Sequence, residues 1–230
     1  NLVRLVLESA TEPTPGMLTP ADWKSIEEIQ QHINNIVLTF SKLAPHLYEM
    51  SHRVRIEVLP AQNKYGIGTA AVSIMGNLWF NEQFVRKQSL KQLRGLIIHE
   101  LLHIMTLTFF RCEDRDPKLW NVATDYYINW MIKNNDKGFA ELPDGGLEPD
   151  DDGFIRSIGG KPVDPPINVD NKDAEGLYDI IFKLAPEIKN QMIETQEKFG
   201  DYHVYPKKGK SSSGSKGPVK KGRAIVGKKV

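Results

Sequence analysis

One stretch of the sequence restricts the fold more than any other: LIIHELLHIM, residues 96–105. It follows Ser89, a residue type that caps helices, and Gln92 three positions later completes a capping-box pattern. We therefore expect a helix from about Ser89 to Phe110 that is surrounded by apolar neighbours. Polar side chains in such a helix cost free energy unless they find partners, and this stretch contains two histidines and a glutamate.

These polar residues form the pattern H-E-x-x-H with His99, Glu100 and His103. Residues four apart on a helix share a face, so both imidazoles can reach one metal ion. Neutral imidazole suits Zn²⁺, and binding offsets the desolvation cost of the polar groups. Glu100 can take a proton from zinc-activated water without being a ligand. The pattern predicts a zinc site; the structural alternative is two ordinary histidines and a helix-stabilising glutamate.

The third ligand is expected on the next helix, from about Pro117 to Lys133. Asn121, Asp125 and Asn129 are spaced i, i+4 and i+8 there and share one face of an otherwise apolar helix. Because catalytic zinc needs three protein ligands and an open position, we expect Asp125 to be the third ligand. Asn121 and Asn129 would then orient ligands by hydrogen bonds. A solvent-facing polar stripe is the alternative.

Other side chains could fill these roles. Further candidates for the third ligand are Glu113, Asp114, Asp116 and His203. The three acids follow the motif too closely for the chain to turn back, which leaves His203 as the main rival. Tyr126 could hydrogen-bond the oxyanion that forms when water attacks a carbonyl, although tyrosines more often serve as packing groups.

Two segments before the metal helix are typical of strands. RVRIEVLP, residues 53–60, alternates apolar and polar residues, and IGTAAVSIMGNLWFN, residues 67–81, predicts two short strands with a turn at Met75-Gly76-Asn77. Ala70 and Ala71 are small and permit close backbone approach. We therefore expect an edge strand here that binds an extended substrate by strand addition, with an ordinary core strand as the alternative.

The remaining pattern indicates an α+β fold with a small mixed sheet packed on the metal helix and additional helices. A helix is predicted from about Ala21 to Leu47, with Thr19 as its cap. Residues 134–173 are rich in Gly, Pro and Asp and predict loops. Residues 173–199 predict a helix that breaks at Pro186.

Charge and composition divide the chain into three parts. We expect an N-terminal extension over residues 1–18, a folded domain over 19–205 and a disordered Lys-rich tail over 206–230. The tail carries nine Lys/Arg and no acids, which leaves 21 basic and 29 acidic side chains elsewhere. It could contact nucleic acid or an acidic partner weakly. A single cysteine and the lack of a long apolar run favour a cytoplasmic protein without a membrane segment.

Several motifs together resemble a known family. GTAAVS, LWFNEQFV, LKQLRGLIIHELLHIMTLTFFR and DPKLWNVATDYYIN resemble the metallopeptidase-like domains that usually lie N-terminal to von Willebrand factor A-like domains in bacterial and phage proteins. DAEGLYDII is similar to the family's Ala-Glu-x-x-Tyr segment. The resemblance implies a zincin-like fold with zinc held by His99, His103 and, by position, Asp125. TFFR departs from the family's usual His-x-Arg, and no von Willebrand A-like domain follows in this sequence.

The sequence predicts a zinc metallopeptidase that cleaves a peptide or protein substrate in the cytoplasm of a bacterium or a phage-infected host cell. The alternative is a non-catalytic, metal-stabilised interaction module that partners an ATPase-driven chaperone system or a von Willebrand A-like domain. Glu100 separates the two hypotheses, because a purely structural zinc site has no use for a general base.

Overall fold

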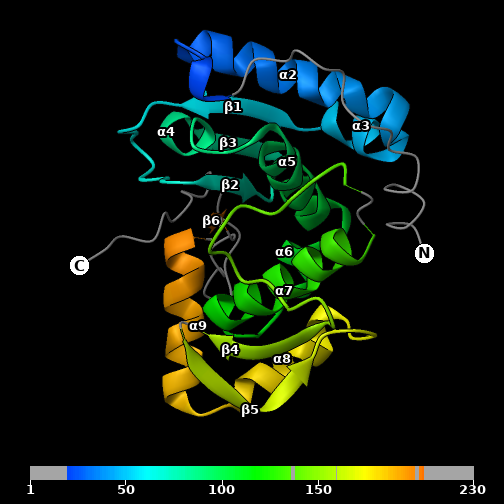
Figure 1. The fold of residues 1–230 in the computed structure, drawn as a ribbon, viewed down its shortest axis with the longest axis vertical. Helices are drawn as coiled ribbons and strands as arrows, with labels where there is room; N and C mark the ends of the chain where they lie inside the picture. The colour runs from blue at the N-terminus through cyan, green and yellow to red at the C-terminus, as the bar shows by residue number, and fades with distance from the viewer. Residues whose placement is uncertain (1–19, 136–137, 159, 200–201, 205–230) are drawn as a thin grey trace, which may run out of the picture.

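The computed structural model describes residues 20–135, 138–158, 160–199 and 202–204. The predicted N-terminal extension and Lys-rich tail lie outside the described residues. The chain has the expected α+β fold, with a small mixed sheet, a separate two-stranded sheet and several helices. In Figure 1 the first helices and the larger sheet occupy the upper half, and the two-stranded sheet and the last helices occupy the lower half.

The larger sheet has the strand order β1-β3-β2-β6. The strands are β1 (Arg55–Leu59), β2 (Ala70–Ser73), β3 (Asn77–Asn81) and β6 (Tyr202–Val204). β2 and β3 form the predicted antiparallel hairpin, while β1 pairs with β3 and β6 pairs with β2 in parallel. Gly76 in the hairpin turn has a φ of 73°, a conformation that favours glycine.

The expectation that β2 is an edge strand is wrong. Ala71 pairs with Tyr202, and the pairing continues to Ser73 and Val204, so β6 covers this edge of β2. The pairing joins segments about 130 residues apart in the chain, and such long-range contacts leave no local pattern in a sequence.

The predicted first helix is divided in two. α2 (Ile26–Leu43) is followed by α3 (Pro45–Ser51), because a residue before proline is disfavoured in helical geometry, and Ala44 has φ −149° and ψ 70°. The predicted cap, Thr19, lies outside the described residues, and the observed N-cap of α2 is Ser25. A short 3-10 helix (Pro20–Asp22) precedes it.

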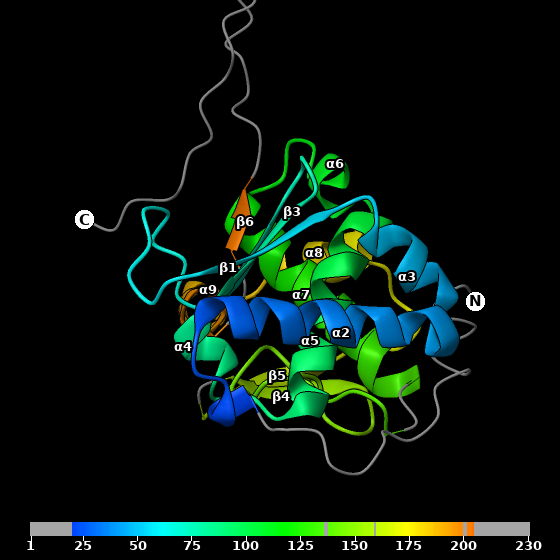
Figure 2. The same cartoon turned by 90° about the horizontal axis from the view of Figure 1, so that it is seen from above.

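α2 lies along β1, as Figure 2 shows from above. The side-chain oxygen Oε1 of Gln30 accepts the backbone N–H of Val58 at 2.8 Å. The helix thereby satisfies a backbone donor on the outer edge of the sheet, which would otherwise be open to pairing with another chain.

The metal helix α5 (Leu90–Met105) begins with the predicted capping box between Ser89 and Gln92. It ends five residues earlier than expected, and α6 (Thr108–Arg111) follows as a separate turn. A short helix, α4 (Glu82–Val85), joins β3 to this region.

The predicted second helix is present as α7 (Pro117–Asn135), and it lies between two hydrophobic cores. Ile128 and Ile132 face the first core, which α5, the sheet and α2 share. Trp120 and Ala123 face the second core, on the opposite side of the helix. A helix buried on both sides leaves little solvent-facing surface, so polar residues in its middle need partners inside the protein.

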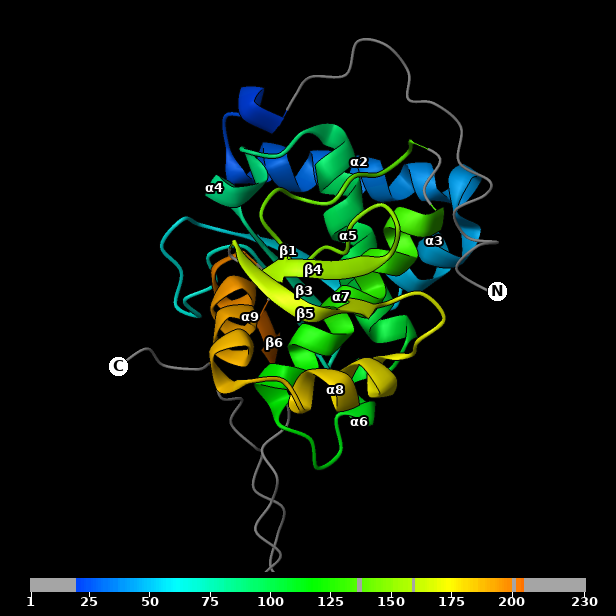
Figure 3. The same cartoon turned by 60° about the horizontal axis from the view of Figure 1, so that its bottom comes forward.

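The second core is formed by the last part of the chain, seen from below in Figure 3. Here β4 (Phe154–Ile158) and β5 (Lys161–Asn168) form an antiparallel pair, which corrects the prediction of loops throughout residues 134–173. α8 (Ala174–Phe182) and α9 (Pro186–Phe199) follow, with the predicted break before Pro186. Among the described residues, no helix is both long and apolar enough to span a bilayer.

Candidate metal centre

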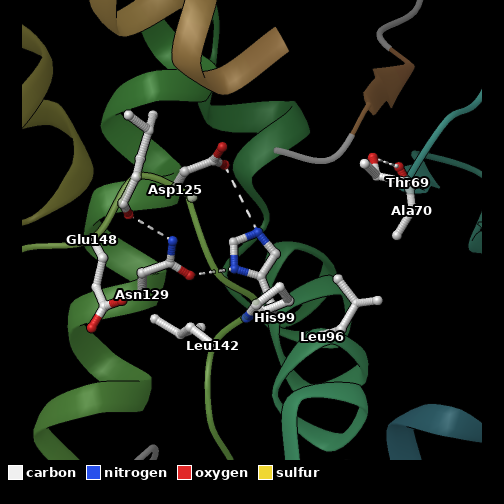
Figure 4. A pocket seen from close by; sticks show the side chains of 11 residues that line it. Thr69, Ala70, Leu96, His99, Asp125, Asn129, Leu142 and Glu148 are labelled. Atoms are coloured by element: carbon white, nitrogen blue, oxygen red, sulfur yellow. Dashed lines mark hydrogen bonds and ion pairs between the residues drawn. The ribbon is translucent and has the colours of Figure 1, made fainter. Parts of the chain in front are cut away.

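Two histidines of α5 and one aspartate of α7 meet in the space between these helices. Figure 4 shows one of the histidines, His99, facing Asp125. Nε2 of His103 lies 2.9 Å from Nε2 of His99 and 3.4 Å from Oδ1 of Asp125. Nε2 of His99 lies 3.9 Å from the same Oδ1. One potential ligand atom from each residue lies within 4.8 Å of the others, and all three side chains are buried.

The ring of His99 is oriented from α7. Nδ2 of Asn129 donates to the carbonyl oxygen of Leu147 at 2.7 Å, which leaves Oδ1 of Asn129 facing Nδ1 of His99 at 2.7 Å. A carbonyl oxygen only accepts, so Nδ1 of His99 carries the hydrogen and donates it. Asn129 thus makes a hydrogen bond to a histidine of the cluster, and its role in orienting a metal ligand stays a prediction.

The ring of His103 is oriented by Thr108, a residue that the sequence analysis missed. Oγ1 of Thr108 donates to the carbonyl oxygen of His103 at 3.1 Å and lies 3.2 Å from Nδ1 of the same histidine. Since the hydroxyl hydrogen is already used, Oγ1 accepts the hydrogen of Nδ1. Trp120 holds the turn in place, because its Nε1 donates to the carbonyl oxygen of Thr108 at 2.9 Å.

These contacts fit the requirements of a metal ion. When both rings are neutral and carry their hydrogen on Nδ1, their Nε2 lone pairs face each other at 2.9 Å, and a proton or a metal ion between them removes the repulsion. Ligands about 2.0 Å from a tetrahedral zinc ion are about 3.3 Å from one another. The observed separations of 2.9, 3.4 and 3.9 Å bracket that value.

Glu100 is fully buried on α5, directly after His99. It does not belong to the group of described residues whose ligand atoms all lie within 4.8 Å of one another. The cluster thus offers two nitrogen donors and one carboxylate donor, with Glu100 as a neighbouring acid outside that set.

Two other residues of α7 that were expected at the site have different surroundings. Asn121 is half-buried one turn before Asp125, and its backbone carbonyl accepts a hydrogen bond from Thr124. Tyr126 is 2% exposed and packs in the second core. Burial raises the pKa of the Tyr126 phenol, and the charge of Asp125 adds to this, so the phenol keeps its hydrogen at neutral pH.

The three acids that were rival third ligands do not join the cluster of described residues. Glu113 and Asp114 are exposed, and Oδ1 of Asp116 accepts the backbone N–H of Lys118 at 2.9 Å at the start of α7. The side chain of His203 lies outside the described residues. Among the described residues, Asp125 is the acid whose carboxylate lies with the two histidines.

A hollow opens beside His99, between β2, α5, α7 and the loop that follows α7. Ala70 of β2 and the preceding Thr69 form one wall, and Leu96 of α5 forms another (Figure 4). The loop forms the third wall with residues 142–143 and 146–148. Asp125 and Asn129 of α7 also line it. The candidate metal centre is therefore adjacent to a space that a small group can enter. Ala71, the other small residue that was expected to contact the substrate, is not among the residues that line the hollow, because it is fully buried and pairs with β6.

The Ala-Glu-x-x-Tyr segment ties α8 to the region after the metal helix. Arg111 makes a two-pronged ion pair with Glu175, and its Nη1 donates to the carbonyl oxygen of Thr106 at 3.0 Å. The hydrogen bond from Arg111 lowers the pKa of Glu175. The hydroxyl of Tyr178 accepts the backbone N–H of Asp116 at 2.9 Å. Both contacts fix the connection between α5 and α7, and so the spacing of the helices that carry the cluster.

Comparisons with known proteins bear on the family of this chain. A protein of Thermotoga maritima described as "Uncharacterized protein" is 28% identical over 108 residues, which are 45% of this chain and 26% of that protein. No solved structure matches the chain. The family described as "Putative metallopeptidase domain" matches residues 27–221, most of the chain and all of the elements that form the cluster. The chain therefore belongs to this family of metallopeptidase-like domains.

Proposed function

We propose that this protein is a zinc-dependent metallopeptidase with a zincin-like arrangement of its metal helix. His99, His103 and Asp125 would hold the ion. The observation that carries the proposal is the pair of Nε2 atoms 2.9 Å apart, each in a ring whose Nδ1 is already held by another residue. The family's description adds support for peptidase chemistry.

A zinc ion bound there would supply a Lewis acid that makes water acidic enough to lose a proton near neutral pH. Glu100 would accept that proton at a carboxylate oxygen and later deliver it to the leaving amine nitrogen. Asn129 and Thr108 would keep the two imidazoles in the tautomer that leaves Nε2 for the ion. Tyr126 would have a packing role in this scheme, since its ring lies in the second core.

The substrate would be a peptide or protein segment that enters through the hollow beside His99. Ala70 lines this hollow, and its small side chain permits close approach of a peptide backbone. Strand addition along Ala71–Ser73 would first require displacement of β6, because these residues already pair with it. We therefore place the substrate against Ala70 and the loop, with Ala71 supporting that wall from the core.

The depth of the cluster favours a second candidate function, a metal-stabilised interaction module. His103 and Glu100 are both 0% exposed, which is typical of structural metal sites. The chain spans only about a quarter of the length of its Thermotoga relative, where further regions could supply a partner. A von Willebrand A-like domain, an ATPase or an acidic partner of the basic tail would be candidates.

A peptide-library cleavage assay on the zinc-loaded protein separates the two functions. For the peptidase, Glu100→Gln keeps its zinc and loses about 10²–10⁴-fold in cleavage rate. Glu187→Gln, a matched change at an exposed position of α9, cleaves like the wild type. Stoichiometric zinc without turnover of any peptide by the wild type would favour the interaction module.

A further inference from the structure

The hollow beside His99 has the chemistry of a side-chain pocket. We infer that it binds one aliphatic side chain of the substrate, of about leucine size, next to the bond that is cleaved. This inference rests on the proposed peptidase function and adds to it a substrate class and a residue, Leu142, that sets the size of the accepted side chain.

Apolar side chains form most of the wall. Leu96 and Leu147 are nearly buried, at 6% and 3% exposure, and Leu142 and Pro143 lie half-buried nearer to solvent. Figure 4 shows Leu96 and Leu142 on either side of the His99 ring. The hollow is open to solvent at its mouth, so a side chain can enter between these walls. An aliphatic group placed there would bury apolar surface on both sides.

The described residues that line the hollow offer no positive charge to an acidic side chain. Asp125 and Glu148 contribute carboxylates to the lining, and no lysine or arginine is among the described residues that form it. A basic side chain gains little, because Nζ of Lys133 already lies 2.7 Å from Glu148. Asp125 and Asn129 are engaged with the histidine cluster. An uncharged, apolar side chain is the class that remains.

The loop wall is held at both ends, so the hollow is formed before any substrate binds. The backbone N–H of Glu141 donates to the carbonyl oxygen of Lys91 at 3.1 Å, and Nζ of Lys133 donates to the carbonyl oxygen of Pro149 at 3.0 Å. Gly95 leaves the space that the loop occupies, since a Cβ there would lie 1.9 Å from the carbonyl oxygen of Glu141. A fixed wall can discriminate between side chains by size.

The same loop connects the hollow to the cluster. The carbonyl oxygen of Leu147 accepts the hydrogen bond that orients Asn129, and Asn129 in turn holds His99. A side chain that fills the hollow therefore contacts the segment that positions one of the proposed ligands. This places the occupant within reach of the reacting bond.

Variants with a larger or a smaller side chain at position 142 test the inference on the zinc-loaded full chain. With a peptide library, the wild type should cleave next to Leu, Ile or Val about 10–100-fold faster than next to Gly or Asp. Leu142→Trp should shift the preference to Ala or Gly, and Leu142→Ala should shift it to Phe, with zinc content unchanged. Leu38→Trp and Leu38→Ala, at an exposed position of α2, should keep the wild-type preference.

A binding measurement keeps this inference separate from the peptidase proposal. Calorimetry compares leucine hydroxamate with glycine hydroxamate, two metal-binding probes that differ in the side chain. We expect leucine hydroxamate to bind the wild type at least about 10-fold more tightly, and Leu142→Trp to remove the difference. If leucine hydroxamate binds more tightly in this way but no peptide is cleaved, the pocket is supported and the peptidase function is rejected. Equal affinities, or a cleavage preference that no Leu142 variant changes, would overturn the pocket.

Discussion

The hydroxyl of Thr108 lies 3.2 Å from Nδ1 of His103 and donates to the carbonyl oxygen of the same residue. Thr108→Val keeps the shape and removes the acceptor, so the ring loses the contact that selects its tautomer. We expect zinc affinity to fall about 10–100-fold. Thr106→Val is the control, because the Thr106 hydroxyl donates to the carbonyl oxygen of Leu102 instead. Equal zinc affinities of the two variants in a chelator competition would reject the role of Thr108.

Thr108 could not be predicted, because the helix was expected to continue to Phe110. The chain instead leaves α5 through Leu107, which has a φ of 55°. Glycine or asparagine usually marks such a left-handed residue, and leucine gives no signal of that kind. The histidine pair was predictable because helix geometry alone brings residues i and i+4 to one face.

Asn129 offers a second test of the contacts around the histidines. Asn129→Leu removes both the acceptor for His99 and the donor to Leu147, so the ring and the loop lose a common anchor. We expect zinc affinity to fall about 10–100-fold and peptide binding in the hollow to weaken as well. Asn135→Leu lies on the same helix and loses only a hydrogen bond to Met131, so its zinc affinity should match the wild type.

Gly95 supports the wall of the hollow from α5. Gly95→Ala places a methyl group against the backbone of Glu141, which is not a flexible side-chain end that could move aside. We expect a loss of about 1–3 kcal/mol in the free energy of unfolding, measured by denaturant titration. Gly68→Ala is the control, since nothing lies within 4 Å of its added Cβ. A Gly95→Ala protein as stable as the wild type would show that the loop does not rest on α5 in this way.

The ion pair between Arg111 and Glu175 predicts a dependence of stability on pH. Its hydrogen bond lowers the pKa of Glu175 in the folded state, so the pair stabilises the fold above the unfolded pKa of glutamate. The stabilisation is lost as the pH falls through the lowered, folded-state pKa. Glu175→Gln should therefore cost about 1 kcal/mol near pH 7 and much less near about pH 3.

Denaturant titrations of wild type and Glu175→Gln at both pH values measure this effect. Glu197→Gln provides the control, because the side chains of Glu197 and its ion-pair partner Lys118 are both more than half exposed. Exposed pairs contribute little, so this variant should change stability by less than about 0.5 kcal/mol at either pH. A cost of Glu175→Gln that stays constant with pH would contradict the assignment.

Features that depend on neighbouring residues could be predicted from the sequence, whereas pairings between distant segments could not. Asp125 was predictable from a polar stripe on an otherwise apolar helix, and the structure explains the stripe by placing α7 between two cores. β5 was missed because Pro162, Pro165 and Pro166 are unusual in strands, and they are tolerated here because a two-stranded sheet consists of edges. β6 has only three residues and pairs with a strand far away in the chain.

The binding of one divalent ion by His99, His103 and Asp125 is the central claim. Zinc content and affinity, measured on metal-stripped and reloaded full chain, test it most directly in the wild type, His103→Ala and Asp125→Ala. We expect about one zinc per wild-type chain and a loss of affinity of at least about 100-fold in each variant, because two ligands of three hold zinc poorly. A wild type that takes up no zinc, or an Asp125→Ala protein that binds it as tightly as the wild type, would contradict this account.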